Sequence, residues 1–364
     1  MTAARYLACR CGVSLAENHN HQATRRDCQD RVAPLGGLRS EELIMIKNKK
    51  TLITGGRGFI GVNLIQSLSP TRNVRVLDSL HRSSPTGWLN GVADFFQADI
   101  LEPATLTQAF DGVSDVVHLA AYGSVVESVA DSRTNFSVNA QGTLNVLQAA
   151  VDAGVRRLVF ASTGGALIGE ANPPVDERSL PKPISPYGAS KLCGEAYCHA
   201  YAKSYGLETV CLRFGNVYGH HSAHKKGAVT VFIKALMNDQ PIIIHGDGMA
   251  SRDYIHVDDL CNGIATALDA PLEGGEVFHL ASGRETTVLE LANMLRNIAG
   301  KPNHPIEFKP GRRGEVTRNF ANFSKAKEHL GFQPKWRVEE GLAATWQWFM
   351  DQGDSILSVE TTES

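Results

Sequence analysis

From about residue 49 the chain alternates short apolar runs with longer segments in which apolar residues recur at helical spacing. Short continuous apolar runs are typical of strands buried on both faces, as in parallel sheets with helical crossover connections. The alternation therefore predicts an α/β fold, a Rossmann-type doubly wound parallel sheet with helices on both faces. The expected strands lie at residues 50–54, 74–78, 94–98, 115–120, 157–162 and 208–213.

Two long helices are predicted beside the last two of these strands, at residues 134–153 and 187–205. The first is indicated by apolar residues that fall on one helical face. These residues are Phe136, Val138, Leu144, Val146, Leu147 and Val151.

Beyond about residue 220 the strict alternation loosens, which predicts a smaller C-terminal α/β portion. We expect a first domain at residues 45–220 and a second portion at 221–364, with a cleft between them. Ligands of open α/β sheets bind at the carboxyl ends of the strands, so those ends should border the cleft. The expected C-terminal elements are helices at 227–238, 257–270, 287–299, 324–330 and 338–351, and strands at 242–244 and 276–281.

A glycine-rich turn follows the first expected strand. Gly55, Gly58 and Gly61 stand where a buried strand runs into a helix, an arrangement that holds a dinucleotide pyrophosphate at the helix N-terminus. Asp78 closes the next strand, twenty positions after Gly58, where a carboxylate binds the adenosine ribose. A carboxylate repels a 2′-phosphate, so Asp78 favours NAD over NADP, although the nearby Arg82 is a contrary sign.

Tyr187 and Lys191 lie four residues apart in the expected helix at 187–205, so both side chains project from one face. By themselves they fit equally a packed tyrosine beside a lysine that extends to solvent. Together with the glycine-rich turn, they indicate an enzyme that uses a nicotinamide cofactor.

Composition narrows the possible partners. With 364 residues, 43% of them hydrophobic, and a net charge of −2, the chain has no overall field that would attract nucleic acid or anionic lipid. No apolar run reaches the roughly 20 residues that cross a bilayer, and none resembles a secretory signal. We therefore expect a cytoplasmic protein with no membrane or nucleic-acid partner.

The seven cysteines have no repeated spacing, which fits reduced thiols. Residues 1–44 mix charged, polar and small residues without periodicity, and Met45 precedes the first strand, so we expect a disordered extension or an unused upstream start. Cys9, Cys11, His19, His21 and Cys28 lie in this segment. They lack a paired zinc-ligand spacing, and no metal is predicted.

The motifs together resemble the extended short-chain dehydrogenase/reductases of the nucleotide-sugar epimerase/dehydratase family, above all the UDP-sugar 4-epimerases. The resemblance covers residues 49 to 350. It is carried by the turn at 54–61, 98–100, 118–121, 162–169, the Tyr187 and Lys191 pair, 213–219, 252–260 and 311–315.

The resemblance implies a catalytic set of Thr163, Tyr187 and Lys191. A phenol has an ordinary pKa near 10, and a neighbouring ammonium and the positive nicotinamide favour its ionised form. Tyr187 is then the general base, Thr163 donates to the same sugar oxygen, and Lys191 also holds the nicotinamide ribose. A strand-end residue that caps a turn is the alternative for Thr163.

In similar dehydratases and decarboxylases an acidic residue follows the Thr163 position. Here Gly164 and Gly165 follow instead, so the acid and base for a second proton transfer are missing. The chain also has Ile168 where the family usually has tyrosine. The two glycines favour reversible oxidation at one sugar carbon, whereas Ile168 is expected to reshape the pocket wall without affecting the proton-transfer groups.

The resemblance also assigns the ligand-binding residues. Cofactor contacts are expected from Gly55, Gly58, Phe59, Ile60, Gly61, Asp78, Asp99, Ile100, Leu119, Ala120 and Ala121, besides Tyr187 and Lys191. For the substrate, Arg252 and Arg312 match the positions that bind the diphosphate, as suits planar guanidinium groups, and Asn216 matches a position at the same end. Thr163 contacts the sugar, and Asn319 falls where family members set the room beside its 2-substituent.

The favoured interpretation is an NAD-dependent 4-epimerase that interconverts UDP-hexoses through a 4-keto intermediate. Another NAD-dependent sugar-nucleotide enzyme (uronate epimerase, decarboxylase, dehydratase or reductase) and a non-catalytic dinucleotide sensor stay open. The resemblance further implies a homodimer formed by the helices at 134–153 and 187–205, with contacts from Leu192, Cys193 and Ala196.

Overall fold

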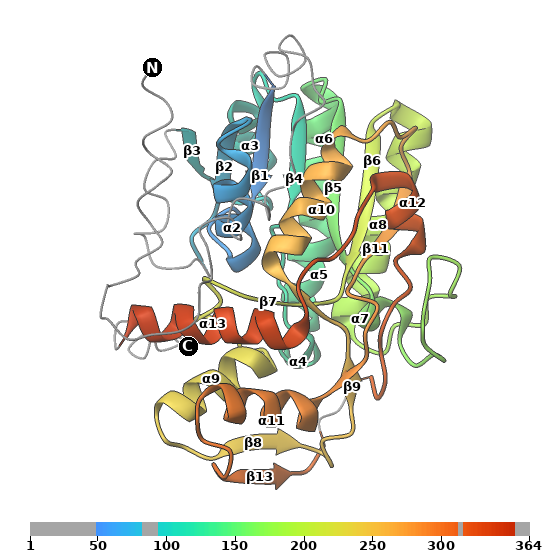
Figure 1. Ribbon diagram of the computed structural model, residues 1–364. Helices are drawn as coiled ribbons and strands as arrows, with labels where there is room; N and C mark the ends of the chain where they lie inside the picture. The colour runs from blue at the N-terminus through green and yellow to red at the C-terminus, as the bar shows by residue number, and fades with distance from the viewer. Residues whose placement is uncertain (1–48, 82–93, 312–315, 354–364) are drawn as a thin grey trace. The chain divides into compact units, whose positions relative to one another are not determined.

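The computed structural model describes residues 49–81, 94–311 and 316–353. A parallel sheet of seven strands lies at its centre, in the order β11-β6-β5-β4-β1-β2-β3 (Figure 1). The strands are β1 (Lys50–Thr54), β2 (Asn73–Asp78), β3 (Asp94–Gln97), β4 (Asp115–His118), β5 (Arg157–Thr163), β6 (Glu208–Phe214) and β11 (Glu276–Leu280). Strands β1 to β6 lie in the order β3-β2-β1-β4-β5-β6, which is that of a dinucleotide-binding sheet. The predicted fold class is therefore confirmed.

Helices cover both faces of this sheet (Figure 1). Because side chains alternate along a strand, Ile53 of β1 packs with one set of helices and Leu52 with the other. The first set is α2 (Phe59–Leu68), α10 (Val257–Asp269) and α12 (Ser324–Leu330). The second is α3 (Pro103–Phe110), α6 (Gly142–Asp152) and α8 (Pro186–Tyr205).

The remaining elements build a smaller cluster below the sheet in Figure 1. Its apolar core joins helices α9, α11 and α13 to the parallel pair β8 and β13. These elements are α9 (Ala228–Met237), β8 (Ile242–His245), α11 (Val288–Ile298), β13 (Ile306–Lys309) and α13 (Val338–Gln352). Short pairs join β7 (Asn216–Tyr218) to β10 (Tyr254–His256) and β9 (Ser251–Arg252) to β12 (Thr286–Thr287).

The helix expected at 134–153 is not continuous. It consists of α5 (Ser132–Phe136), a π-helical turn at Ser137–Gln141 and α6. The turn contains Asn139, whose side chain bonds to the backbone of Tyr122. Such turns often occur at functional sites, and periodicity alone did not reveal this one. Two short helices, α4 (Val125–Ala130) and α7 (Gly165–Ile168), also flank the site.

The expected division near residue 220 does not coincide with the edge of the sheet. Strand β11, assigned from the sequence to the C-terminal portion, pairs with β6 along Glu276–Leu280. Helix α10 packs on the same sheet. The chain therefore returns to the dinucleotide-binding sheet after residue 220, because β6 offers an open edge and β11 an apolar run to cover it. A search of the described residues for a helix long and apolar enough to span a membrane finds none.

Candidate active site

The predicted cofactor residues follow the carboxyl ends of neighbouring strands. The chain leaves β1 and β4, which are adjacent, toward opposite sides of the sheet, and this switch point is where such folds bind dinucleotides. Gly55 follows β1, Asp78 ends β2, Leu119 follows β4 and Thr163 ends β5. The fold thus brings these sequence-distant positions to one edge of the sheet.

The glycine-rich turn requires glycine for steric reasons. Gly55 has a φ of 67°, and a Cβ there would stand 2.7 Å from the Cα of Ala120. A Cβ on Gly61 would stand 2.6 Å from the Cα of Gly56. Gly58 is the N-cap of α2 and offers no side chain to the amides of the first turn, where Phe59 and Ile60 lie. Those amides can meet a pyrophosphate, so the turn fits a dinucleotide.

Asp78 is held in place by the backbone around it. Its carboxylate accepts hydrogen bonds from the amides of Arg57 at 2.9 Å and Leu80 at 2.9 Å, and the residue is 8% exposed. Each carboxylate oxygen keeps acceptor capacity for a ribose hydroxyl. Arg82, the contrary sign in the sequence, lies outside the described residues.

The adenine and middle sections of the expected cofactor site are built from backbone turns. After β3, Asp99 accepts a hydrogen bond from the amide of Leu101 at 2.9 Å, and Ile100 is buried. After β4, the amides of Leu119 and Ala120 bond to Thr54, at 3.1 Å to its carbonyl and 3.3 Å to its hydroxyl. Ala121 follows in the same loop and is partly buried.

His118 supports this loop from below. Its imidazole bonds to the hydroxyls of Thr54 at 2.7 Å and Thr143 at 3.0 Å. Burial, with the nearby charge of Lys191, lowers the pKa of His118 to about 3. The imidazole is therefore neutral at physiological pH, and its role is structural: it links Thr54 and Thr143 by hydrogen bonds.

The three predicted catalytic residues come together. Ser185 caps α8 by accepting the amide of Gly188 at 3.2 Å, and Pro186 occupies the first turn, so the helix starts just before Tyr187. Burial raises the pKa of Tyr187 to about 12, and the nearby Thr163 side chain opposes this rise, so the two side chains lie close to each other.

Lys191 is buried, with only 3% of its surface exposed. Its ammonium donates to the carbonyl of Ala161 at 2.8 Å and lies 4.8 Å from the centre of the Phe160 ring. Burial lowers the pKa of Lys191 to about 8, while electrostatic interactions with the neighbouring Cys198 and Glu195 act in the opposite direction. Burial of the charged Lys191 side chain therefore destabilises the folded chain.

A buried ion pair lies one helical turn beyond Lys191. The Glu195 carboxylate accepts two hydrogen bonds from Arg213 of β6, at 2.9 and 2.8 Å, and one from Ser162 at 2.6 Å. Both charged side chains are at most 6% exposed. Sequence reasoning missed this pair, although the spacing of Glu195 four residues after Lys191 was a signal.

Asn139 of the π-helical turn is a second missed residue. Its side chain accepts the amide of Tyr122 at 2.7 Å and donates to the hydroxyl of Ser190 at 3.0 Å. Ser190 in turn donates to the carbonyl of Tyr187 at 2.9 Å. The turn therefore ties the loop after β4 to the start of the catalytic helix.

The glycines after Thr163 face two side chains from distant segments. A Cβ on Gly165 would stand 2.9 Å from the amide group of Asn319, and one on Gly164 would stand 3.4 Å from His279. Asn319 is 6% exposed, and its Nδ2 has no hydrogen-bond partner in the described structure. Asn319 thus lies beside the end of β5, and it fills the space that a side chain at residue 165 would need.

The predicted diphosphate residues are only partly described. Asn216 is exposed at the start of β7, and Arg252 is partly exposed in β9, where it donates to the carbonyl of Ser251 at 2.8 Å. Arg312 lies outside the described residues. Leu192, expected at a dimer interface, instead packs inward against the apolar cluster that contains Leu167.

Among the described residues, His220, His256 and Asp258 have potential metal-ligand atoms within 4.8 Å of one another. The His256 imidazole already accepts the amide of Asp258 at 3.3 Å and so caps α10. Burial lowers the pKa of His256 to about 4. Because a helix N-terminus also disfavours cations, the arrangement is that of a helix cap with an adjacent His220 to Asp258 contact of 3.6 Å.

The fold and this site define an NAD-binding enzyme of the short-chain dehydrogenase type, and comparison with known proteins agrees. Residues 51–281 match the NAD dependent epimerase/dehydratase family. The chain therefore belongs to this family, whose cofactor is NAD.

Individual relatives cover nearly all of the described chain. UDP-glucose 4-epimerase of Mycolicibacterium smegmatis is 34% identical, over 83% of this chain and 99% of the relative. The structure of UDP-glucose 4-epimerase from Thermotoga maritima with UDP-glucose has a TM-score of 0.80 at 35% identity, covering 83% of this chain and 99% of that one.

The Thermus thermophilus UDP-glucose 4-epimerase structure, a complex with NAD, has a TM-score of 0.77 at 34% identity, over 83% of this chain and 99% of that one. Relatives named dTDP-glucose 4,6-dehydratase and UDP-glucuronate 4-epimerase also match, at 32% and 31% identity. Similarity alone therefore identifies the family but does not identify the reaction, which must be inferred from the active-site residues.

Proposed function

We propose that this chain is a UDP-hexose 4-epimerase. The observation that carries the proposal is the close approach of Asn319 to Gly165, where an added Cβ would stand 2.9 Å from the Asn319 side-chain amide. A dehydration requires a second acid and base after Thr163, and glycines occupy those two positions. Because Asn319 fills the adjoining space, the site supports proton transfer at one sugar hydroxyl.

In the proposed reaction, Tyr187 takes the proton of the sugar 4-hydroxyl and later returns it. Bound NAD would supply the hydride acceptor and donor for the sugar C4 and a positive charge beside the phenol. Burial raises the pKa of Tyr187 to about 12, too high for a base at neutral pH, and such a positive charge would lower it. Thr163, which lies beside Tyr187, orients the same sugar oxygen.

Epimerisation also needs the sugar to turn over while the nucleotide stays bound. Asn216, Arg252 and Arg312 are the proposed diphosphate contacts, since guanidinium groups suit a diphosphate and the net charge of −2 supplies no general attraction. Asn319 is the proposed gate beside the sugar 2-substituent. An asparagine is smaller than an aromatic residue and can bond an amide, so we expect N-acetylated sugars to be accepted as well.

Relatives named dTDP-glucose 4,6-dehydratase make a dehydratase one alternative, which the glycines after Thr163 disfavour, and relatives named UDP-glucuronate 4-epimerase make a uronate epimerase another. The uronate epimerase would use the same proton transfer by Tyr187, so the active-site residues described above do not separate the two substrates. A decarboxylase, a reductase and a non-catalytic dinucleotide sensor are further alternatives. The presence of Thr163, Tyr187 and Lys191 at one end of the sheet favours an active enzyme over a sensor.

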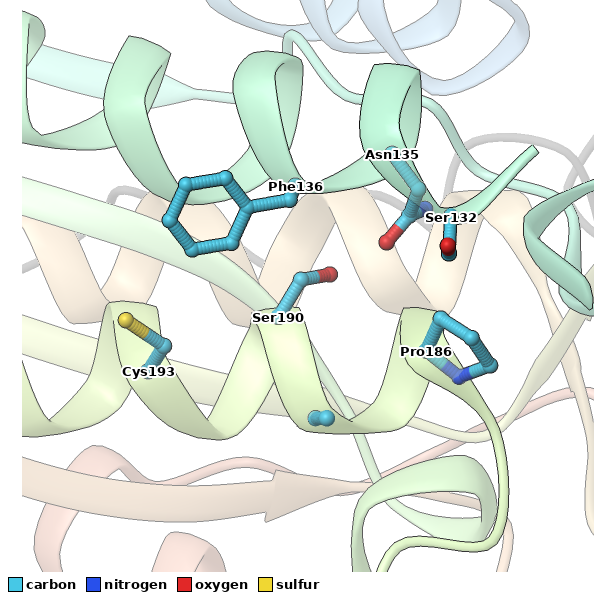
Figure 2. A pocket seen from close by; sticks show the side chains of 7 residues that line it. Ser132, Asn135, Phe136, Pro186, Ser190 and Cys193 are labelled. Carbon is cyan, nitrogen blue, oxygen red and sulfur yellow. The ribbon is translucent and has the colours of Figure 1, made fainter.

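We also propose a homodimer, formed through α5 and α8. Figure 2 shows the groove between these helices, about 330 Å³ in volume, with Phe136 of α5 and Cys193 of α8 on its walls. Phe136 is 61% exposed, which is unusual for a large apolar side chain beside an apolar groove. Ala196 lies exposed on the same helix as Cys193.

The proposed function is tested with a panel of nucleotide sugars and chromatographic separation of the products. The panel contains UDP-glucose, UDP-galactose, their N-acetylated forms, UDP-glucuronate and dTDP-glucose. Conversion of UDP-glucose and UDP-galactose into each other supports the proposal. Conversion of UDP-glucuronate alone, or release of a 4-keto-6-deoxy product, would replace it with an alternative.

A further inference from the structure

A buried carboxylate outside the catalytic set links the segments that carry the proposed substrate contacts. Asp253 lies between β9 and β10 and is 2% exposed. Its Oδ1 accepts hydrogen bonds from both the amide and the hydroxyl of Ser282, each at 2.7 Å. Its Oδ2 accepts the amides of Gly283 at 2.9 Å and Ala321 at 3.3 Å. Every partner is a donor, so the site requires two acceptor oxygens.

The backbone of the same residue holds a further segment. The carbonyl of Asp253 accepts the amide of Asn216 at 2.6 Å. A Cβ on the preceding Gly215 would stand 3.0 Å from that carbonyl, so the two chains approach as closely as glycine allows. Asn216 is thereby fixed directly to the residue that follows Arg252.

Asn319 is attached to the same place. The backbone N–H of Asn319 donates to the carbonyl of Ser251 at 3.1 Å. The backbone N–H of Ala321, two residues later, donates to the Asp253 carboxylate at 3.3 Å. The segments that carry Asn216, Arg252 and Asn319 therefore meet at one buried aspartate. No local feature of the sequence joins these positions.

We propose that Asp253 is a positioning residue for the nucleotide sugar, setting the separation of Asn216, Arg252 and Asn319 without contacting the substrate itself. The inference rests on the proposed function, since those three residues are its substrate contacts. It goes further by assigning their alignment to one carboxylate. Loss of that carboxylate would then weaken substrate binding more than it slows chemistry at Tyr187.

The test uses Asp253→Asn in the full chain. An amide replaces one acceptor oxygen with a donor that faces backbone N–H groups, so the contacts cannot all re-form. We expect KM for the nucleotide sugar and the dissociation constant for UDP to rise roughly 10- to 100-fold. We expect kcat to change less than threefold and bound NAD to stay at the wild-type level, because no cofactor contact depends on Asp253.

Asp259 offers a matched control. It is also buried, at 5% exposed, and accepts the amides of Lys335 at 2.9 Å and Trp336 at 3.0 Å. Those partners carry no proposed substrate contact. Asp259→Asn should lower the melting temperature while KM and UDP binding stay unchanged, which separates positioning from general destabilisation.

Ser282→Ala provides a milder variant, since it removes the hydroxyl donor to Asp253, and with it the acceptor for the Arg284 amide at 3.3 Å, but keeps the backbone bond from Ser282 to Asp253. It should raise KM a few-fold, and it decides the question if Asp253→Asn does not fold. If KM is unchanged in the folded variants, or if KM rises equally in the Asp259→Asn control, the positioning role of Asp253 is wrong. The proposed function would still stand in that case. A wild type that binds no UDP and converts no nucleotide sugar would overturn the proposed function and this inference together.

Discussion

Replacing Lys191 by methionine should make the NAD-free protein more stable at neutral pH. Burial lowers the pKa of Lys191 from 10.5 to about 8. At 1.36 kcal/mol for each pKa unit, this lowering corresponds to a destabilisation of about 3 kcal/mol when the lysine is charged. Methionine has a similar volume and no charge, but it loses the hydrogen bond to Ala161, which offsets about 1 kcal/mol. The expected net gain is about 2 kcal/mol at pH 7.

The gain should disappear with rising pH. The pKa is lower in the folded than in the unfolded chain, so between pH 8 and 10.5 the unfolded wild type binds more protons and its stability rises with pH. By pH 9.5 the cost of the charged lysine falls to about 1 kcal/mol. The advantage of Lys191→Met should then be near zero, whereas below pH 8 it is complete.

Urea unfolding of the NAD-free proteins at pH 7 and pH 9.5 measures both quantities. Lys203→Met, which removes an exposed lysine near the end of the same helix, is the control. It should change stability by less than about 0.5 kcal/mol at either pH. If Lys191→Met is less stable than the wild type at pH 7, or if its advantage does not shrink at pH 9.5, the interpretation of Lys191 as a buried charge is wrong.

Three further predictions concern function and assembly. Tyr187→Phe should lower turnover about 10²- to 10⁴-fold with bound NAD unchanged, because the general base is lost while the ring stays; near-normal turnover would remove Tyr187 from the mechanism. Asn319→Tyr should depress activity on UDP-N-acetylhexosamines more than on UDP-glucose, by about 1–3 kcal/mol in relative kcat/KM; equal losses on both would refute the gate. In sedimentation the wild type should be a dimer at micromolar concentration, and Phe136→Asp a monomer, because a charge in the α5 to α8 groove opposes apolar contact. A wild type that sediments as a monomer would contradict the proposed interface.

The sequence by itself determined those features that depend on neighbours along the chain. Apolar runs and their spacing located the strands β1 to β6 to within two residues at either end, and the glycine-rich turn with Asp78 indicated the dinucleotide site. The helix expected at 187–205 agrees with α8 to within one residue, and the spacing of Tyr187 and Lys191 placed them on one face. Each of these inferences uses local propensity or periodicity, which a short stretch of chain contains in full.

Only the tertiary structure decided what depends on partners far away in the sequence. Nothing in the run at Glu276–Leu280 indicates that it pairs with β6, because an apolar strand fits any open edge. Buried polar groups show the same limit, since Glu195 finds Arg213 on another element and Asp253 finds Ser282 and Ala321. A buried charge must be compensated where it lies in the fold, and that place is set by packing of the whole sheet.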